Sequence, residues 1–125
     1  MSTFTDSLTV TKIDARRWRV EREFTYYIGE ENSNEFVTVP KGFETDFASV
    51  PRLFWSILPP DGTYTQAAVL HDFLYSVQLY TRKRSDEIFL EAMAVLRVWV
   101  VRRLIMFSQV RLWGFIPWNK KRKVG

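Results

Sequence analysis

Two neighbouring stretches decide the fold of the second half of this chain: Ala67-Ala68-Val69-Leu70-His71-Asp72-Phe73-Leu74-Tyr75 and Ser85-Asp86-Glu87-Ile88-Phe89. The first predicts a helix over residues 66–79. On that helix His71 and Tyr75 lie one turn apart, with Asp72 about 100° round from the histidine. One helix face therefore carries an imidazole and a phenol, next to a carboxylate.

The polar connection 80–85 is short, so a second helix that begins near Asp86 is expected to pack antiparallel against the first. Asp86 then reaches His71. A carboxylate that holds one imidazole nitrogen leaves the other able to take a proton from water, and Tyr75 can anchor that carboxylate. Asp72 is available for a hard cation such as Ca²⁺. The pattern predicts an acid–base site, with a polar network that only locks two helices together as the alternative.

These residues resemble the catalytic helix pair of the phospholipase A2 superfamily in its cysteine-free viral form, where A-A-x-x-H-D-x-x-Y is followed by A-D-x-x-F. The resemblance covers residues 64–93. It assigns roles to three residues: the base His71, its partner Asp86 and the supporting Tyr75. It also implies Ca²⁺ on Asp72. The sequence departs from that superfamily in having no G-x-G of a glycine-rich calcium loop, and Asp46 is expected to supply a side-chain oxygen in its place.

A second resemblance rests on the run Gly42-Phe43-Glu44-Thr45-Asp46-Phe47-Ala48-Ser49-Val50-Pro51-Arg52 together with the two motifs quoted above. It is to a domain-of-unknown-function family common in tailed-phage and prophage genomes, and it spans residues 18–95. This resemblance implies a bacteriophage origin and no particular activity.

A chain of 125 residues with 46% hydrophobic residues is expected to form one folded domain, residues 1–125. The expected class is α+β. Its parts are a β-rich segment over 1–41 that forms a hairpin or small antiparallel sheet, a packed irregular loop over 42–63, a helical pair over 64–107 and a basic aromatic tail over 108–125.

Apolar residues alternate with polar ones between Arg17 and Ile28, interrupted at Arg22, which predicts a half-buried strand. Residues 35–39 are expected to form the returning strand, and residues 7–13 an edge strand.

The second helix is expected to take Ser85 as its N-cap and to carry an apolar stripe from Phe89 to Phe107. Three arginines, Arg97, Arg102 and Arg103, interrupt the most apolar part, so no transmembrane segment is expected.

Charge is divided unevenly along the chain. Residues 1–80 hold seven Lys/Arg against eleven Asp/Glu, and residues 81–125 hold eleven against three. The second half should therefore seek anions. A membrane-binding or anion-binding set is predicted near the C-terminus: Trp113, Trp118, Lys120, Lys121, Arg122 and Lys123. Nucleic acid is a less expected partner.

Two functions follow as hypotheses. The first is a phage-encoded, Ca²⁺-dependent ester hydrolase that acts on host envelope phospholipid during entry or lysis. The second is a non-catalytic virion or tail-assembly protein that uses the same scaffold to contact other virion proteins. Because residues 1–10 carry no signal-peptide pattern, host cytoplasm is the expected place of synthesis, with incorporation into the virion as a further step.

Overall fold

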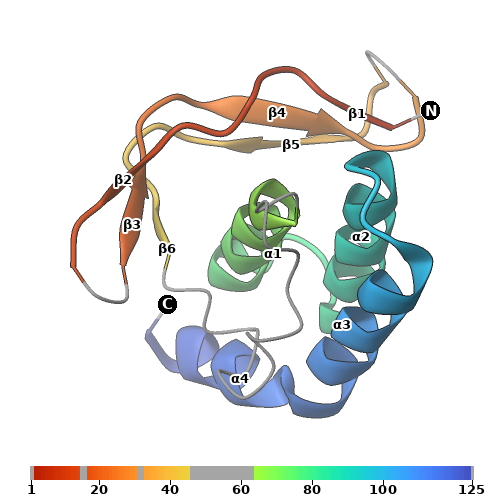
Figure 1. Ribbon diagram of the computed structural model, residues 1–125. Helices are drawn as coiled ribbons and strands as arrows, with labels where there is room; N and C mark the ends of the chain where they lie inside the picture. The colour runs from red at the N-terminus through yellow and green to blue at the C-terminus, as the bar shows by residue number, and fades with distance from the viewer. Residues whose placement is uncertain (1, 15–16, 31–32, 46–63, 125) are drawn as a thin grey trace. The chain divides into compact units, whose positions relative to one another are not determined.

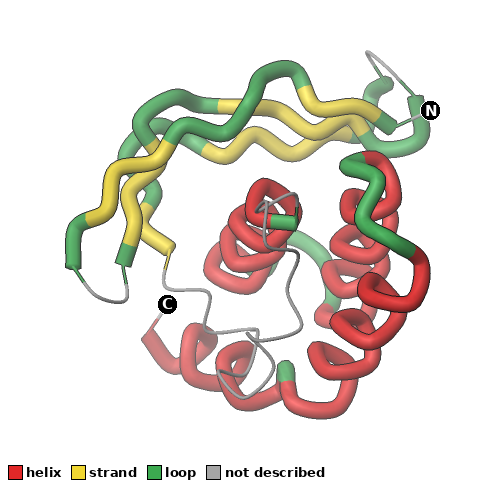
Figure 2. Tube along the Cα trace, viewed as in Figure 1, coloured by secondary structure: helices red, strands yellow, loops and turns green. Residues whose placement is uncertain are grey.

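A computed structural model describes residues 2–14, 17–30, 33–45 and 64–124 of the protein. Strands precede helices along the chain, as Figures 1 and 2 show, and this order confirms the predicted α+β class. The chain divides into two compact units, a β-rich unit, Met1–Asp46, and a helical unit, Phe47–Gly125. The single domain expected over residues 1–125 stays a prediction.

In the β-rich unit, the residues that the structure describes form two three-stranded antiparallel sheets. One has the order β1-β4-β5, with bounds Thr3–Phe4, Phe24–Tyr27 and Phe36–Val39. The other has the order β2-β3-β6, with bounds Val10–Lys12, Trp18–Val20 and Glu44–Thr45.

The first sheet buries one face through alternate residues, as the sequence predicts. Phe24 lies opposite Val39 and Tyr26 opposite Val37, and all four are buried. From β1, the Phe4 ring packs on Tyr26 with centroids 4.6 Å apart. The other face carries a cross-strand hydrogen bond between two threonine hydroxyls.

The single strand expected between Arg17 and Ile28 is wrong. The chain bends at Glu21–Glu23, so β3 and β4 belong to different sheets. The interruption at Arg22 marks this break, because three successive charged residues cannot continue an apolar alternation. The expected edge strand is present as β2, and β6 lies at the start of the predicted loop. The rest of that loop, residues 46–63, lies outside the described residues.

The described residues of the helical unit form four helices, α1 Thr65–Val77, α2 Arg82–Val95, α3 Val100–Trp113 and α4 Phe115–Val124. Helix α1 packs against α2 and α4, α2 also packs against α3, and α3 against α4 (Figure 1). The four contacts close a circuit around an apolar interior. Large buried side chains of these helices are Leu70, Leu74, Ile88, Phe89, Met93 and Met106.

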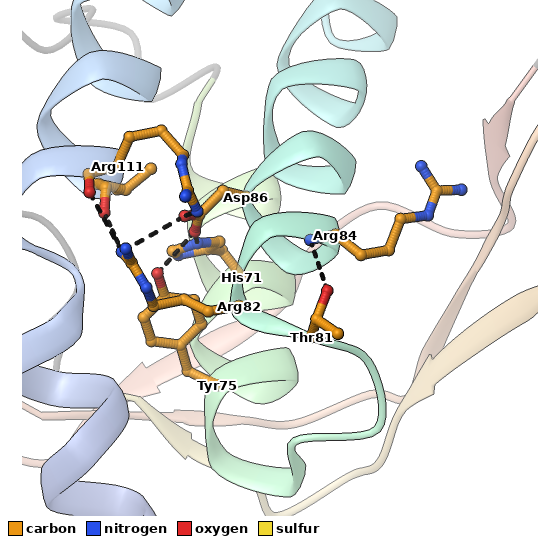
Figure 3. A network of polar contacts seen from close by, with 8 residues as sticks. His71, Tyr75, Thr81, Arg82, Arg84, Asp86 and Arg111 are labelled. Atoms are coloured by element: carbon orange, nitrogen blue, oxygen red, sulfur yellow. Dashed lines mark hydrogen bonds and ion pairs between the residues drawn. The ribbon is translucent and has the colours of Figure 1, made fainter.

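The expected long second helix and trailing tail are wrong in their boundaries. Helix α2 begins at Arg82, and its N-cap is Thr81 rather than Ser85. The Thr81 hydroxyl accepts a hydrogen bond from the Arg84 amide (Figure 3). The segment expected to be a tail continues as the end of α3 and as α4.

Helix α2 ends because Arg97 adopts the left-handed conformation, with φ 62°. The Val98 amide donates to the Met93 carbonyl, and the Arg97 amide to the Ala94 carbonyl. This is the Schellman arrangement, which usually has glycine at the left-handed position. Because Arg97 is neither glycine nor proline, the helical pattern of the sequence continues through this helix end.

Within the described segments, every helix is too short or too polar to span a bilayer.

Candidate functional site

Three helices meet at the carboxylate of Asp86 on α2 (Figure 3). His71 Nε2 lies 2.6 Å from Asp86 Oδ1, and the Tyr75 hydroxyl donates to the same oxygen at 2.6 Å. Arg111, from α3, donates through Nη1 to Oδ2 at 2.7 Å. The predicted contact of His71 and Tyr75 with Asp86 is therefore confirmed, and a cation that the sequence did not predict completes the cluster.

Helical spacing on α1 positions the two aromatic members of the cluster. His71 and Tyr75 are four residues apart, and their ring centroids are separated by 4.3 Å. Phe89, one turn after Asp86 on α2, lies 4.6 Å from the imidazole. His71, Tyr75 and Asp86 are all fully buried, so packing as well as hydrogen bonding holds the imidazole in place.

The hydrogen bonds determine which imidazole nitrogen is basic. An ionised carboxylate only accepts, so in neutral His71 the proton shared with Asp86 is carried by Nε2. Acceptor character then falls on Nδ1. An imidazole in this tautomer, oriented by a carboxylate, is suited to take a proton at Nδ1.

Burial raises the pKa of the Tyr75 phenol, and the hydrogen bond and negative charge of Asp86 raise it further. The Arg82 guanidinium opposes this shift to a lesser extent. The phenol therefore stays protonated across the neutral range and serves as a donor to Asp86.

Arg82 joins the start of α2 to the end of α3. Its Nη1 donates to the carbonyl oxygens of Val110 and Arg111, at 3.1 and 3.2 Å, and lies 3.7 Å from Asp86 Oδ2. The Val110 carbonyl also accepts from the Gly114 amide at 2.8 Å, and carbonyls in the last turn of a helix carry partial negative charge. A cation at this position therefore stabilises the end of α3.

Helix α4 covers the Tyr75 side of the cluster. The Trp118 ring meets Tyr75 edge-on with centroids 5.1 Å apart, and the Trp118 carbonyl accepts from Gln78 Nε2 at 2.9 Å. Between α3 and α4, Gly114 lies so close to the Val110 carbonyl and the Tyr75 hydroxyl that a Cβ would collide with both.

The residues predicted to bind calcium are not assembled into a site by the described part of the chain. Asp72 is buried on α1, one residue after His71, while Asp46 lies outside the described residues. Over residues 2–14, 17–30, 33–45 and 64–124, no group of three or more His, Cys, Asp and Glu side chains is placed to hold a metal ion.

The residues predicted to bind a membrane or an anion take different positions. Trp113 is half exposed and Lys120 is exposed, whereas Trp118 is partly covered and contacts Tyr75. The side chains of Lys121, Arg122 and Lys123 lie outside the described part of the structure.

Sequence reasoning missed three members of this cluster, Arg82, Arg111 and Gly114. Arg82 stands four residues before Asp86, which is the spacing of a helical ion pair. A predicted helix with Thr81 as its N-cap would have placed these two residues on one helix face. Arg111 is 25 residues from Asp86, and no local pattern predicts that contact.

Comparisons with known proteins agree with the second resemblance in part. Residues 18–110 match the family described as "Protein of unknown function (DUF1353)". The uncharacterized protein y4jT of Sinorhizobium fredii (strain NBRC 101917 / NGR234) is 32% identical over 88 residues, which are 69% of this chain and 26% of that protein. The chain thus spans about a quarter of the length of this curated relative. No solved structure matches the chain. Because the family match covers most of the sequence, the chain belongs to the DUF1353 family.

Proposed function

We propose that the helical unit is a hydrolytic site of phage origin, in which His71 activates water for attack on a phospholipid ester of the host envelope. The observation that carries this proposal is the 2.6 Å contact between His71 Nε2 and Asp86 Oδ1, with Tyr75 on the same oxygen. Together these contacts orient the imidazole and direct its basic nitrogen, Nδ1, away from the carboxylate.

In the proposed reaction Nδ1 takes a proton from water as the water oxygen bonds to the ester carbonyl carbon. The bond between that carbon and the alcohol oxygen then breaks, and the proton passes from Nδ1 to the leaving alcohol. The products are a carboxylic acid and an alcohol. Positive charge on His71 during the reaction is stabilised by Asp86, whose other oxygen is held by Arg111.

Calcium is part of the resemblance to phospholipase A2, and it would stabilise the oxyanion that forms on the ester carbonyl. The described residues offer Asp72 but no complete ligand set. No step of the proposal runs through the ion, and the assay therefore contains calcium and chelator arms.

The test is release of fatty acid from mixed phospholipid vesicles by the full chain. Wild type is expected to release fatty acid, and His71→Gln and Asp86→Asn are expected to reduce the rate at least about a hundredfold. Ser76→Ala, which removes an α1 hydroxyl bonded to the Asp72 carbonyl, is the matched control and should keep full activity. Circular dichroism checks that each variant is folded. Absence of release from folded wild type in both arms, or release that His71→Gln leaves unchanged, rejects the hydrolase.

A second function, a virion or tail-assembly protein without catalysis, is favoured by the completeness of the cluster. Asp86 is fully buried, one of its oxygens is shared by His71 and Tyr75, and the other contacts Arg111. A polar network satisfied in this way locks helices together and specifies their register.

Accessibility of His71 separates the two functions, because this is the only histidine in the chain. Diethyl pyrocarbonate, which adds to unprotonated imidazole nitrogen, gives an absorbance change that reports on His71 alone. Modification of the native protein at a rate near that of the unfolded chain supports the hydrolase. Modification only on unfolding, together with recovery of the protein in purified particles, supports the structural function.

A further inference from the structure

Helix α3 carries an apolar stripe on its outer side, here called the α3 stripe and made of Val101, Leu104, Ile105 and Leu112. At 100° per residue these positions, with Ser108 among them, fall within an arc of about 100°. The two buried residues of α3, Met106 and Val110, lie on the opposite side of the helix. The α3 stripe is thus a second apolar face, separate from the one that packs into the unit.

Exposure of the α3 stripe is high for side chains of this type. Leu104 is 49% exposed and Leu112 63% exposed, and Val101 and Ile105 are also exposed. Two tryptophans stand at the ends of the helix, Trp99 at 66% and Trp113 at 50% exposure. A helix that is apolar on both sides normally has both sides covered, so the α3 stripe is expected to meet a partner.

The charge of this region selects the kind of partner. Residues 92–125 contain eight Lys/Arg and no Asp or Glu. Two of these cations are engaged inside the unit, since Arg111 bonds Asp86 and Arg103 donates to the Val98 carbonyl. Arg97 and Lys120 have exposed side chains. The partner must therefore combine an apolar interior with negative charge at its surface.

A second copy of this chain does not meet that requirement, because a two-fold contact through α3 would place these basic segments against each other. An anionic bilayer does meet it. Apolar side chains of an interfacial helix enter the boundary between headgroups and acyl chains, and Lys and Arg pair with anionic lipid.

We infer that the α3 stripe docks the helical unit on an anionic lipid surface with α3 lying in the plane of the interface. This inference deepens the proposed function, since it names how the unit would meet a phospholipid. It rests on the α3 stripe and not on His71. It does not use the two tryptophans of the predicted C-terminal set, because Trp118 packs on Tyr75 and Trp113, twelve residues after Val101, falls outside the arc of the α3 stripe.

The test is flotation of the full chain with vesicles of ether-linked phospholipids, which contain no ester to hydrolyse, so binding is measured apart from catalysis. Wild type and His71→Gln are expected to float with vesicles that contain phosphatidylglycerol and to remain free with phosphatidylcholine alone. Raising the salt concentration should weaken binding, because exposed basic groups are screened.

Leu104→Gln and Leu112→Gln are each expected to weaken binding about tenfold, because each removes an apolar side chain from the interface. Leu79→Gln is the matched control. It is 64% exposed in the same unit but lies outside the α3 stripe, and it should bind as wild type does.

A label places the contact directly, since the chain has no cysteine of its own. Ser108→Cys, labelled with an environment-sensitive fluorophore, should show a blue shift on anionic vesicles, and labelled Leu79→Cys should not. Folded wild type that stays free of anionic vesicles overturns the inference, as does binding that both leucine variants leave unchanged. A dimer that dissociates on Leu104→Gln in the absence of vesicle binding would instead assign the stripe to a second copy.

Discussion

Arg111, near the end of α3, donates to Asp86 Oδ2 at 2.7 Å, on the oxygen opposite the one that His71 and Tyr75 contact. The side chain of Asp86 is fully buried, whereas that of Arg111 is 32% exposed. The charge of the buried carboxylate is thus balanced by a residue that comes from a different helix and keeps part of its surface in solvent.

Replacement of Arg111 by Met should leave this carboxylate underbalanced, because Arg82 is 3.7 Å away and already donates to two carbonyls. We expect Arg111→Met to lower the free energy of unfolding by about 2 kcal/mol, less than for a fully buried pair. Urea denaturation measures the change. Arg102→Met on the same helix is the control and should stay within about 0.5 kcal/mol of wild type. A double variant with Asp86→Asn should lose less than the sum of the two single variants.

Gly114 is a position where space rather than backbone conformation requires glycine, since its φ is −63°. A Cβ there would collide with the Val110 carbonyl and the Tyr75 hydroxyl. Gly114→Ala should therefore cost at least about 2 kcal/mol and weaken the bond from Tyr75 to Asp86. Ser108→Ala, an exposed small-residue change on α3, should be nearly neutral. Equal thermal stability of the two variants would contradict this account.

The N-terminus of α2 allows a paired test of the cap. Thr81 accepts from the Arg84 amide, whereas the buried Ser85 hydroxyl has no hydrogen-bond partner among the described residues. Thr81→Ala should lower the free energy of unfolding by about 1 kcal/mol. Ser85→Ala should be neutral or stabilising, because it removes an unsatisfied buried group. If chemical denaturation showed that Ser85→Ala destabilises the protein more than Thr81→Ala does, Ser85 would be the N-cap of α2.

Arg97 offers a stabilising substitution. It holds a left-handed conformation, φ 62°, at the Schellman end of α2, and its side chain is exposed. Arg97→Gly should raise the free energy of unfolding by about 0.5–1 kcal/mol, because glycine adopts this conformation without steric cost. The change is read from urea denaturation, with Arg84→Gly inside α2 as the contrasting variant. That second variant should destabilise by about 1 kcal/mol.

Alkaline pH should expose the role of Tyr75, whose pKa is raised by burial and by Asp86. A phenol with a raised pKa in the folded state contributes stability that is fully present below its unfolded pKa of about 10 and is lost as pH rises further. The free energy of unfolding of wild type should therefore fall above pH 10, and that of Tyr75→Phe should fall less. Parallel curves of unfolding free energy against pH for the two proteins would show that folding does not raise the pKa of the Tyr75 phenol.

The sequence predicted the contact between His71 and Asp86 because it depends on local spacing. One helical turn and one short connection suffice to place His71, Tyr75 and Asp86 together. The α+β class followed in the same way from strand alternation and helical periodicity. These signals act within about twenty residues and need no knowledge of the remaining fold.

The rest of the cluster could not be predicted because it depends on where α2 ends. The helix stops through the backbone of Arg97, which has no glycine or proline signature, so the apolar stripe from Phe89 to Phe107 reads as one helix. Without that break, Arg111 cannot return to Asp86, and α4 cannot bring Trp118 to Tyr75. Because the sequence pattern did not show the helix end at Arg97, the contacts of both Arg111 and Trp118 were missing from the predicted site.

The single histidine of the chain sits where α1, α2 and α3 converge. Its imidazole protons will give isolated resonances in a nuclear magnetic resonance spectrum, without the overlap that several histidines cause. Those resonances sense the carboxylate of α2, the phenol of α1 and, through Asp86, the guanidinium of α3. One pair of peaks thus provides an internal gauge of whether the three helices are assembled, in any variant and under any condition.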